Sequence, residues 1–371
     1  MAIGRTNASV GGGGSQMKAL IDGRGSCANL FVGFSGTSVN NIISYNYTEN
    51  AKSMANTFAD CNNLTSIPLL NTSNVTNMYY AFNDCRSLIT IPQLDTSKVT
   101  NMYGMFYYCK NLTSIPLLDT SNVTNMSSMF TYCQSLITIP QLDTSKVTNM
   151  QGMFYECTNL TSIPQLNTSN VTEINGLFYY CKNLNSIPAL DLSKATNLRE
   201  MFYGCESLTT ISLLNTSNVT KMYQTFYNCK NLNSISISDT SNVKDMDSTF
   251  SNCIRLTTVP LFNTSNVTSM NGTFSNCQAL ISIPALDVSN VNNLVSAFWR
   301  CSNLESIEMT GMKVSFNISD STKFTREALV VILNNLATVS TSQTLTMGAT
   351  NLAKLTEEDK LIATNKGWTL E

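Results

Sequence analysis

Apolar residues recur along most of the chain with a fixed period of 24 residues. If each cysteine of the series is counted as position 1, Leu stands at position 4, Ile or Val at position 7, Val or Ala at position 15, Met, Ile or Leu at position 18, and Phe at position 22. Positions 18, 21 and 22 and the next cysteine are spaced i, i+3, i+4 and i+7, which is typical of one face of a helix. The segment "LTSIP" at positions 4 to 8 is instead rich in β-branched residues, as strands are. Each repeat therefore predicts one short strand, a turn and one short helix.

Proline fixes where the strand should end, because it occurs only at position 8 of the repeat. A residue without an N–H group cannot donate within a hydrogen-bonded ladder, so the strand should cover roughly positions 4 to 7. After it, Asn or Asp at position 11 and Ser at position 13 supply side chains for a turn and for the first N–H groups of the helix, as Asp119 and Ser121 do in one repeat. The prolines are Pro68, Pro92, Pro116, Pro140, Pro164, Pro188, Pro260 and Pro284.

Neither predicted element is stable by itself. A helix of about eight residues is marginal in water, and a four-residue strand needs a partner. The repeats must therefore stack in register, so that Leu packs on Leu and Phe on Phe and the strands form a parallel sheet. Ten full repeats fill residues 61–300, and a partial repeat follows.

The sequence of the repeat also resembles that of a known family. The pattern L-x-x-I-P-x-L-[DN]-T-S-x-V-x-x-M-x-x-[MAT]-F-x-x-C, over roughly residues 53–308, resembles the BspA-like bacterial surface leucine-rich repeats. The resemblance implies an α/β repeat solenoid, right-handed and leucine-rich-repeat-like, with a short parallel strand and a short helix in each 24-residue turn and a cap at each end. It also implies a role in adhesion at a cell surface, and similar repeats occur in phage-encoded proteins of gut bacteria. The chain departs from secreted members because no apolar stretch typical of a signal peptide follows Arg5.

The regions outside the repeats predict the domain boundaries. Residues 1–16 contain "SVGGGGSQ" and are predicted to be a flexible attachment peptide and tether. The alternative is a linker introduced for expression. A phosphate-binding loop is not favoured, because the Lys-Ser/Thr pair that it would need does not follow. Residues 17–60 are predicted to form an N-terminal cap with a partial repeat, in which "NIISYNYT" supplies capping strands. Residues 61–308 form the solenoid. Residues 309–371 are predicted to be a C-terminal α/β cap, with a helix capped by Thr325, a strand at "QTLTMGA", and a last helix that begins near Thr356 and ends at Lys366-Gly367.

Composition excludes several classes of function. The chain has no histidine, so Ser-His-Asp and Cys-His catalysis and most zinc and non-haem iron sites are ruled out. A net charge of −2 lacks the basic surface that nucleic acids need, and no apolar run is long enough to cross a membrane. We expect no catalytic residue, no metal and no cofactor. A carboxylate pair that cleaves glycosides is a remote alternative, because no pair of acids stands out from the repeat.

Three ladders of side chains have structural and functional interpretations. The cysteines at position 1 of the repeats are predicted to be buried thiols that act as small apolar residues, with disulfides or a metal site as alternatives. The Asn and Asp residues of position 11 are predicted to cap turns rather than to bind Ca²⁺. Asn-x-Ser/Thr triplets, such as those at Asn46, Asn74 and Asn122, follow from the repeat text, and glycosylation is the minor interpretation.

Tyrosine is the candidate for binding. Positions 2, 3, 19, 20, 23 and 24 vary between repeats while the apolar positions stay constant, and exposed aromatic side chains beside Asn and Ser are typical of binding surfaces. The alternative is that the rings only cover the seam between repeats. The candidate ligand-binding residues are Tyr79, Tyr103, Tyr107, Tyr108, Tyr132, Tyr155, Tyr179, Tyr180, Tyr203, Tyr227 and Trp299.

These observations predict a non-enzymatic virion appendage, of the head- or tail-fibre kind, that is anchored to other virion proteins by its N-terminus. Its exposed repeat surface would bind a bacterial surface protein or glycan. The alternative is a bacterial cell-surface adhesin of BspA type. Repeats 85–108 and 133–156 share "SLITIPQLDTSKVTNM", which indicates that a 48-residue pair of repeats has been duplicated. Such a duplication lengthens a surface and does not build a catalytic centre. No heptad pattern settles whether the protein is an oligomer.

Overall fold

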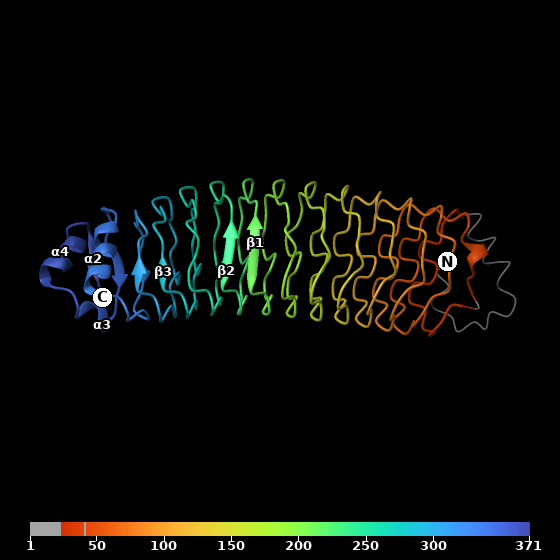
Figure 1. Cartoon of the computed structure of the whole chain (residues 1–371), viewed down its shortest axis with the longest axis horizontal. Helices are drawn as coiled ribbons and strands as arrows, with labels where there is room; N and C mark the ends of the chain where they lie inside the picture. The colour runs from red at the N-terminus through yellow and green to blue at the C-terminus, as the bar shows by residue number, and fades with distance from the viewer. Residues whose placement is uncertain (1–23, 41) are drawn as a thin grey trace. The chain divides into compact units, whose positions relative to one another are not determined.

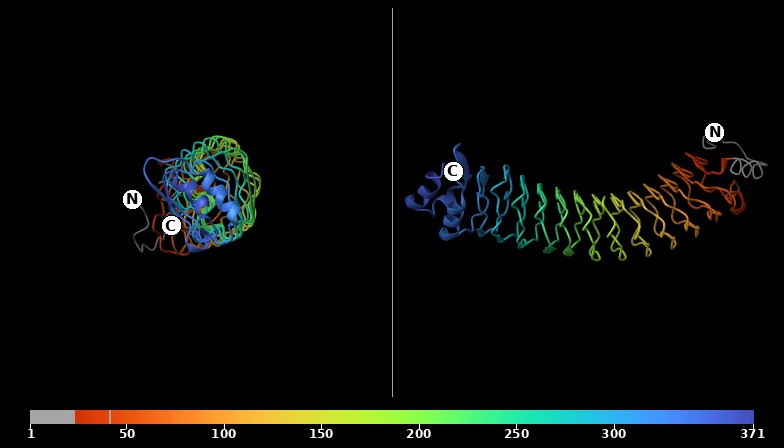
Figure 2. Two further views of the ribbon diagram at one scale, coloured as in Figure 1. Left: turned by 90° about the vertical axis from the view of Figure 1, so that its left-hand side faces the viewer. Right: turned by 90° about the horizontal axis from the view of Figure 1, so that it is seen from above.

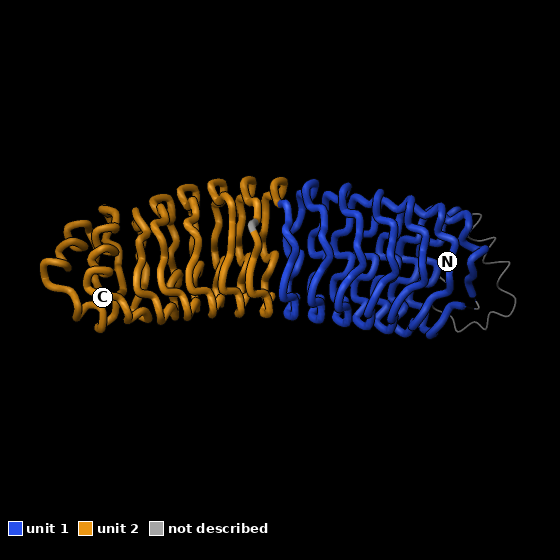
Figure 3. Tube along the Cα trace, viewed as in Figure 1, with its two compact units in different colours: residues 1–191 blue, residues 192–371 orange. Residues whose placement is uncertain are grey.

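The computed structural model describes residues 24–40 and 42–371, and the chain divides into two compact units, residues 1–191 and 192–371 (Figure 3). We refer to them as the first unit and the second unit. The predicted tether of residues 1–16 lies outside the described residues, as do residues 17–23 and 41 of the predicted N-terminal cap. In either unit, successive repeats form successive coils of the chain (Figures 1 and 2).

The core of each unit is a set of identical side chains stacked from coil to coil. In the first unit, Phe106, Phe130 and Phe154 are fully buried, and their rings stack at centroid distances of 5.6 and 5.7 Å with interplanar angles of 8° and 7°. In the second unit, Phe226 and Phe250 stack in the same way at 5.5 Å. The Leu, Val, Met and Cys positions of the repeat are likewise buried. The predicted register of equal repeats is therefore confirmed within each unit.

The helix predicted in each repeat is wrong, because positions 18 to 24 form consecutive turns instead. The N–H groups of Gly104, Phe106 and Tyr108 donate to carbonyls of the next coil at 3.0, 2.9 and 2.7 Å. Between them, the N–H groups of Met105 and Tyr107 donate to carbonyls three residues earlier, at 3.1 and 3.0 Å. Every second amide thus bonds between coils, which an α-helix would forbid because its amides bond within the helix.

Left-handed backbone at two positions produces this zigzag. Position 20 and position 24 have positive φ in repeat after repeat, as Gly104 (58°) and Tyr108 (63°) show. A residue with positive φ ends a helical turn. The apolar side chains at positions 18, 21 and 22 still reach the core, and so the helical spacing of the sequence arises from two turns rather than from a helix.

The prediction of a strand in every repeat is wrong for the first unit, whose described repeats form no strand at positions 4 to 7. In the second unit, strands form at these positions in several repeats and begin at position 6 rather than 4, and proline limits their length. The longest are β1 (Thr210–Leu214) and β2 (Ser234–Ile237), which pair in parallel with Thr210 opposite Ser234. Their repeats are the two full repeats that carry Ser212 and Ser236 in place of proline at position 8. In contrast, β3 (Ser282–Ile283) stops at the residue before Pro284 and pairs in parallel with β4 (Ser306–Ile307). A serine N–H is available to the ladder and a proline is not.

The second unit ends in a cap of helices on a small sheet. Its strands β5 (Phe316–Asn317), β6 (Gln343–Thr346) and β7 (Trp368–Leu370) are parallel in the order β5-β6-β7. Its helices are α2 (Arg326–Asn335), α3 (Ala349–Leu352) and α4 (Glu357–Thr364) (Figure 1).

The predicted start signals of α2 and α4 are confirmed. The Thr325 hydroxyl accepts from the Ala328 N–H, and Thr356 and Asp359 form a capping box. Asp359 also accepts two hydrogen bonds from Arg326 at 2.8 Å, which ties α4 to α2.

The capping strands predicted in "NIISYNYT" are wrong, because η2 (Tyr45–Tyr47) is a single 3₁₀ turn there. No helix in the described part of the chain has the length and apolar character needed to cross a lipid bilayer.

Candidate binding surface

Tyrosine side chains of the first unit form one continuous group, which we call the tyrosine cluster. Its members stand at positions 19, 20, 23 and 24, and each ring lies within 6.4 Å of another ring of the group. The cluster consists of Tyr79, Tyr80, Tyr103, Tyr107, Tyr108, Tyr132, Tyr155, Tyr179 and Tyr180.

The turns of the repeat place these rings at the surface. Positions 23 and 24 directly follow the buried Phe of position 22, and the left-handed residue at position 24 carries its side chain away from the core. Glycine makes room for one ring: a Cβ atom on Gly104 would lie 2.3 Å from the ring of Tyr80. Tyr79 is exposed and the other members are half-buried. The rings thus cover the seam between coils and also face solvent.

Ring stacking decides which part of each tyrosine a partner could touch. Tyr79 and Tyr103 stack at 5.2 Å with an angle of 12°, and Tyr155 and Tyr179 stack at 4.2 Å with an angle of 4°. Because the rings cover one another's faces, their edges and hydroxyl groups are the parts presented to solvent. The hydroxyl of Tyr80 donates to the hydroxyl of Tyr103 at 3.5 Å.

The surroundings of Tyr107 and Tyr155 favour the neutral form of each phenol. Burial, and then neighbouring tyrosines, raise the pKa of Tyr107 and Tyr155 above the ordinary value. Lys110 lies 5.2 Å from the ring centroid of Tyr108, and Lys182 lies 5.1 Å from that of Tyr180, as expected for cation–π contacts. The surface is therefore aromatic and hydrogen-bonding, with lysine side chains beside the rings.

Three of the predicted residues lie elsewhere, in the second unit. Tyr203 and Tyr227 form a stacked pair at 4.6 Å. Trp299 contacts the Arg300 guanidinium, which lies 4.3 Å from its ring centroid. The sequence analysis missed Tyr80, although it stands at a position that varies between repeats.

A second surface, on the strand side of the first unit, was also missed. Positions 5 and 9 are exposed there, and apolar residues occupy them alternately: Ile89 is 51% exposed and Leu117 is 62% exposed. The alternation follows from the duplicated pair of repeats. It is visible in the sequence and could have predicted this surface. An open depression of about 490 Å³ lies over these coils, lined among others by Leu117, Gln93 and Asp119.

The carboxylates of position 11 cap turns, as predicted. Asp119 accepts from the Ser121 N–H at 3.0 Å and from the Ser121 hydroxyl at 2.7 Å, and Asp95 bonds Ser97 likewise. The serine hydroxyl, and then the serine amide, lower the pKa of both carboxyl groups below the ordinary value. Among the described residues, no group of three or more His, Cys, Asp or Glu side chains could hold a metal ion.

These turns predict a loss of stability in acid. A carboxyl group whose pKa is lower in the folded state stabilises the fold fully above its unfolded pKa of about 3.9, and this contribution is lost as pH falls through the folded pKa. We expect the triple variant Asp95→Asn, Asp119→Asn, Asp143→Asn to lose less stability than the unmodified protein between pH 7 and pH 3, because Asn keeps the acceptor oxygen and cannot titrate. Urea denaturation at both pH values measures the difference. An equal loss in both proteins would show that these turns do not titrate with folding.

The cysteines are buried thiols that form no disulfide, as the main interpretation predicts. Thiols along the stack donate to the Phe carbonyl of the adjacent coil, as Cys133 does to Phe106 at 3.1 Å and Cys253 does to Phe226 at 3.1 Å. Burial raises the pKa of Cys301 to about 12 and that of Cys133 well above the ordinary range. The thiols therefore act as small apolar residues that also donate hydrogen bonds to backbone carbonyls.

This burial predicts unreactive thiols. At pH 8 we expect fewer than about one of the 12 cysteines to react with a disulfide reagent within minutes in the native protein, and all 12 to react in guanidinium chloride. Absorbance at 412 nm after addition of dithionitrobenzoate counts them. Rapid reaction of several thiols without denaturant would contradict the packing described here.

The amide groups of the Asn-x-Thr triplets are used inside the fold. Asn122 Nδ2 donates to the Ser97 carbonyl of the preceding coil at 2.8 Å, and Asn74 Nδ2 donates to the Glu49 carbonyl at 2.9 Å. These bonds support the structural interpretation of the triplets.

Comparison with known proteins identifies a sequence family. A model of the family described as "Mycoplasma protein of unknown function, DUF285" matches four overlapping segments, residues 26–138, 110–213, 134–238 and 196–311. No curated protein matches the chain.

Solved structures identify the fold. A leucine-rich repeat protein from Bacteroides ovatus is 19% identical, with 85% of this chain and 86% of that protein covered and a TM-score of 0.51. A leucine-rich cell surface protein from Faecalibacterium prausnitzii is 22% identical, with 67% and 78% covered and a TM-score of 0.37. A leucine-rich repeat protein from Eubacterium ventriosum is 16% identical, with 71% and 77% covered and a TM-score of 0.37. The B. ovatus protein confirms the predicted leucine-rich-repeat solenoid.

Proposed function

Since this chain belongs to the DUF285 family and has the fold of a bacterial leucine-rich repeat protein, we propose that it is a non-enzymatic binding protein of a bacterial cell surface. The single observation that carries the proposal is the tyrosine cluster. Nine rings of one residue type form a continuous surface at positions that the fold leaves free to vary.

The contrast between core and surface supports binding. Phe fills position 22 of every full repeat, whereas position 23 holds a mixture of small polar and aromatic residues, among them Asn83, Thr131, Ser251, Tyr107 and Trp299. A fold that needed tyrosine only to seal its coils would require it in every coil. Tyrosine gathers instead on neighbouring coils of the first unit, as it does in the contact surfaces of binding proteins.

The geometry of the rings favours a protein as the partner. Sugars pack on the open faces of aromatic rings, but the faces of Tyr155 and Tyr179 cover each other at 4.2 Å. What remains is a row of ring edges and hydroxyl groups, which suits backbone and side-chain groups of a protein surface.

Bacterial relatives favour the adhesin alternative over the virion appendage. The family description names Mycoplasma, and the structure with the same fold comes from Bacteroides ovatus. Attachment to a virion through residues 1–16 stays a prediction. Mass spectrometry of cell envelopes and of purified virions distinguishes the two locations, and detection in virions alone would contradict the proposal.

Binding to intact cells tests the proposed function. The fluorescently labelled full chain is incubated with a panel of Gram-positive and Gram-negative bacteria, either untreated, treated with proteinase K, or treated with periodate. We expect saturable binding to at least one strain that proteinase K abolishes and periodate leaves intact. Loss of binding after periodate treatment alone would mean that the tyrosine cluster binds a glycan instead. No saturable binding to any strain would overturn the proposal.

A further inference from the structure

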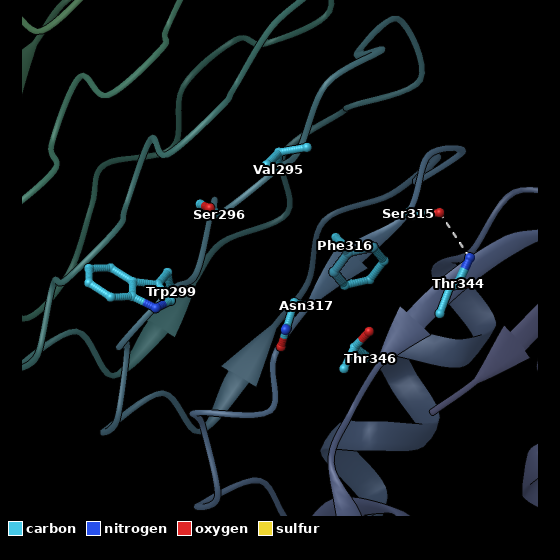
Figure 4. A pocket seen from close by; sticks show the side chains of 8 residues that line it. All are labelled: Val295, Ser296, Trp299, Ser315, Phe316, Asn317, Thr344 and Thr346. Atoms are coloured by element: carbon cyan, nitrogen blue, oxygen red, sulfur yellow. Dashed lines mark hydrogen bonds between the residues drawn. The ribbon is translucent and has the colours of Figure 1, made fainter.

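A separate pocket lies in the second unit, between the last full coil and the C-terminal sheet. It has a volume of about 300 Å³, at the lower end of the range for small-molecule sites. Figure 4 shows its lining: three side chains from the coil, and five from β5, β6 and the residue before β5. The lining residues are Val295, Ser296, Trp299, Ser315, Phe316, Asn317, Thr344 and Thr346.

Strand alternation gives the pocket a polar wall. Phe316 of β5 pairs with Leu345 of β6, and both side chains are buried. Their neighbours along the strands therefore point to the opposite face of the sheet. Asn317 pairs with Thr346, and Thr344 lies two residues earlier on β6. An amide and two hydroxyl groups thus line one face together.

These polar groups have unused hydrogen-bonding capacity. Asn317 Oδ1 accepts from the Ser319 N–H at 2.7 Å, which fixes the side chain and leaves its NH₂ group to donate elsewhere. The Ser315 hydroxyl, by contrast, is occupied: it donates to Gln343 at 3.0 Å and accepts from the Thr344 N–H at 2.9 Å. That second bond holds β6 and its threonines in place (Figure 4).

The other wall is aromatic and apolar. Trp299 is 47% exposed, with the Arg300 guanidinium 4.3 Å from its ring centroid. Among the described residues, no aromatic ring stacks on Trp299, in contrast to the covered faces of the tyrosine cluster. Val295 is 62% exposed beside it. An open indole is thus available at the edge of the pocket.

We propose that this pocket binds a neutral sugar residue, with one apolar face of the sugar against Trp299 and its hydroxyl groups bonded to Asn317, Thr344 and Thr346. None of the eight lining side chains ionises near neutral pH, and the nearby Arg300 guanidinium lies against the Trp299 ring, so the lining itself offers a charged ligand no counter-charge. A purely apolar ligand would leave the hydroxyl and amide groups unpaired. A polyhydroxylated ring satisfies both walls. The proposal is independent of the proposed protein partner of the tyrosine cluster.

Saturation-transfer difference NMR on the full chain tests the site. The probes are the methyl glycosides of glucose, galactose, mannose and N-acetylglucosamine, with N-acetylneuraminic acid and indole for comparison. We expect saturable binding of at least one methyl glycoside, weakened tenfold or more by Thr346→Val, which removes one hydroxyl, and by Trp299→Ala. The control Thr209→Val removes an exposed hydroxyl on another coil of the second unit and should leave the dissociation constant unchanged.

Intrinsic fluorescence provides a second readout, because the other tryptophan, Trp368, is only 2% exposed and should not respond. Titration with the bound glycoside should change the emission of the Thr209→Val protein and not that of Trp299→Ala. Three results would overturn the proposal: no saturable binding of any methyl glycoside, an affinity of Thr346→Val and Trp299→Ala equal to that of the unmodified protein, or tighter binding of indole or N-acetylneuraminic acid than of every methyl glycoside. Variants Tyr155→Ala and Tyr179→Ala should bind the glycoside normally.

Discussion

Replacement of Phe130 by alanine is expected to lower the free energy of unfolding of the first unit by about 3–5 kcal/mol. Phe130 is fully buried and stacks on Phe106 at 5.6 Å and on Phe154 at 5.7 Å. The change removes a ring from the middle of a column and leaves a cavity that neighbouring rings cannot fill, because both are fixed by their own coils. Urea denaturation followed by circular dichroism measures the loss.

A matched control for this prediction is Leu117→Ala. Leu117 belongs to the same repeat as Phe130 but is 62% exposed, so its replacement should change stability by about 0.5 kcal/mol or less. If Phe130→Ala cost no more than Leu117→Ala, the column of rings would not be the core of the coils.

The second large effect concerns binding. We expect the double variant Tyr155→Ala, Tyr179→Ala to bind cells at least about 30-fold more weakly, which corresponds to about 2 kcal/mol, the loss usual for an aromatic hot spot. The two rings stack at 4.2 Å, so either single change would leave the other ring without its partner. Quantitative flow cytometry on a strain that binds the unmodified protein gives both dissociation constants.

Two further variants separate binding from packing. Tyr45→Ala removes an exposed tyrosine of the same unit that lies outside the cluster, and it should bind normally. Tyr155→Phe keeps the stacked ring and removes only the hydroxyl group, so its thermal unfolding should match that of the unmodified protein. Unchanged affinity in the double variant would mean that the tyrosines only cover the seam between coils.

The sequence predicts the core well because each core position repeats many times. It also predicts α2 and α4, since Thr325 and Thr356 are clear N-caps. The sequence does not show that positions 18 to 24 of each repeat form turns rather than a helix. The positive φ at position 24 is visible as glycine at Gly204 but is hidden at Tyr108, a residue that rarely adopts this conformation.

The candidate surface was predicted in part. Variable positions identify eight members of the tyrosine cluster, but the sequence does not show that stacking covers the ring faces. Nor does it show that Trp299 lies outside the cluster, since Trp299 stands at position 23 of its repeat, as Tyr107 and Tyr155 do of theirs. The proposed sugar pocket forms where β5 and β6 lie beside the last full coil. The 24-residue repeat does not extend into β5 and β6, so it could not predict this contact.

Deletion of one whole repeat tests most directly the central claim that equal coils in register position the surface. Removal of Cys109–Tyr132 joins Tyr108 to Cys133 and should place Phe106 against Phe154 with no other change. We expect this protein to unfold cooperatively within about 5 °C of the unmodified chain in differential scanning calorimetry. Removal of Cys109–Thr120, half of the same repeat, should abolish the cooperative transition of the first unit. Equal behaviour of the two deletions would contradict the account.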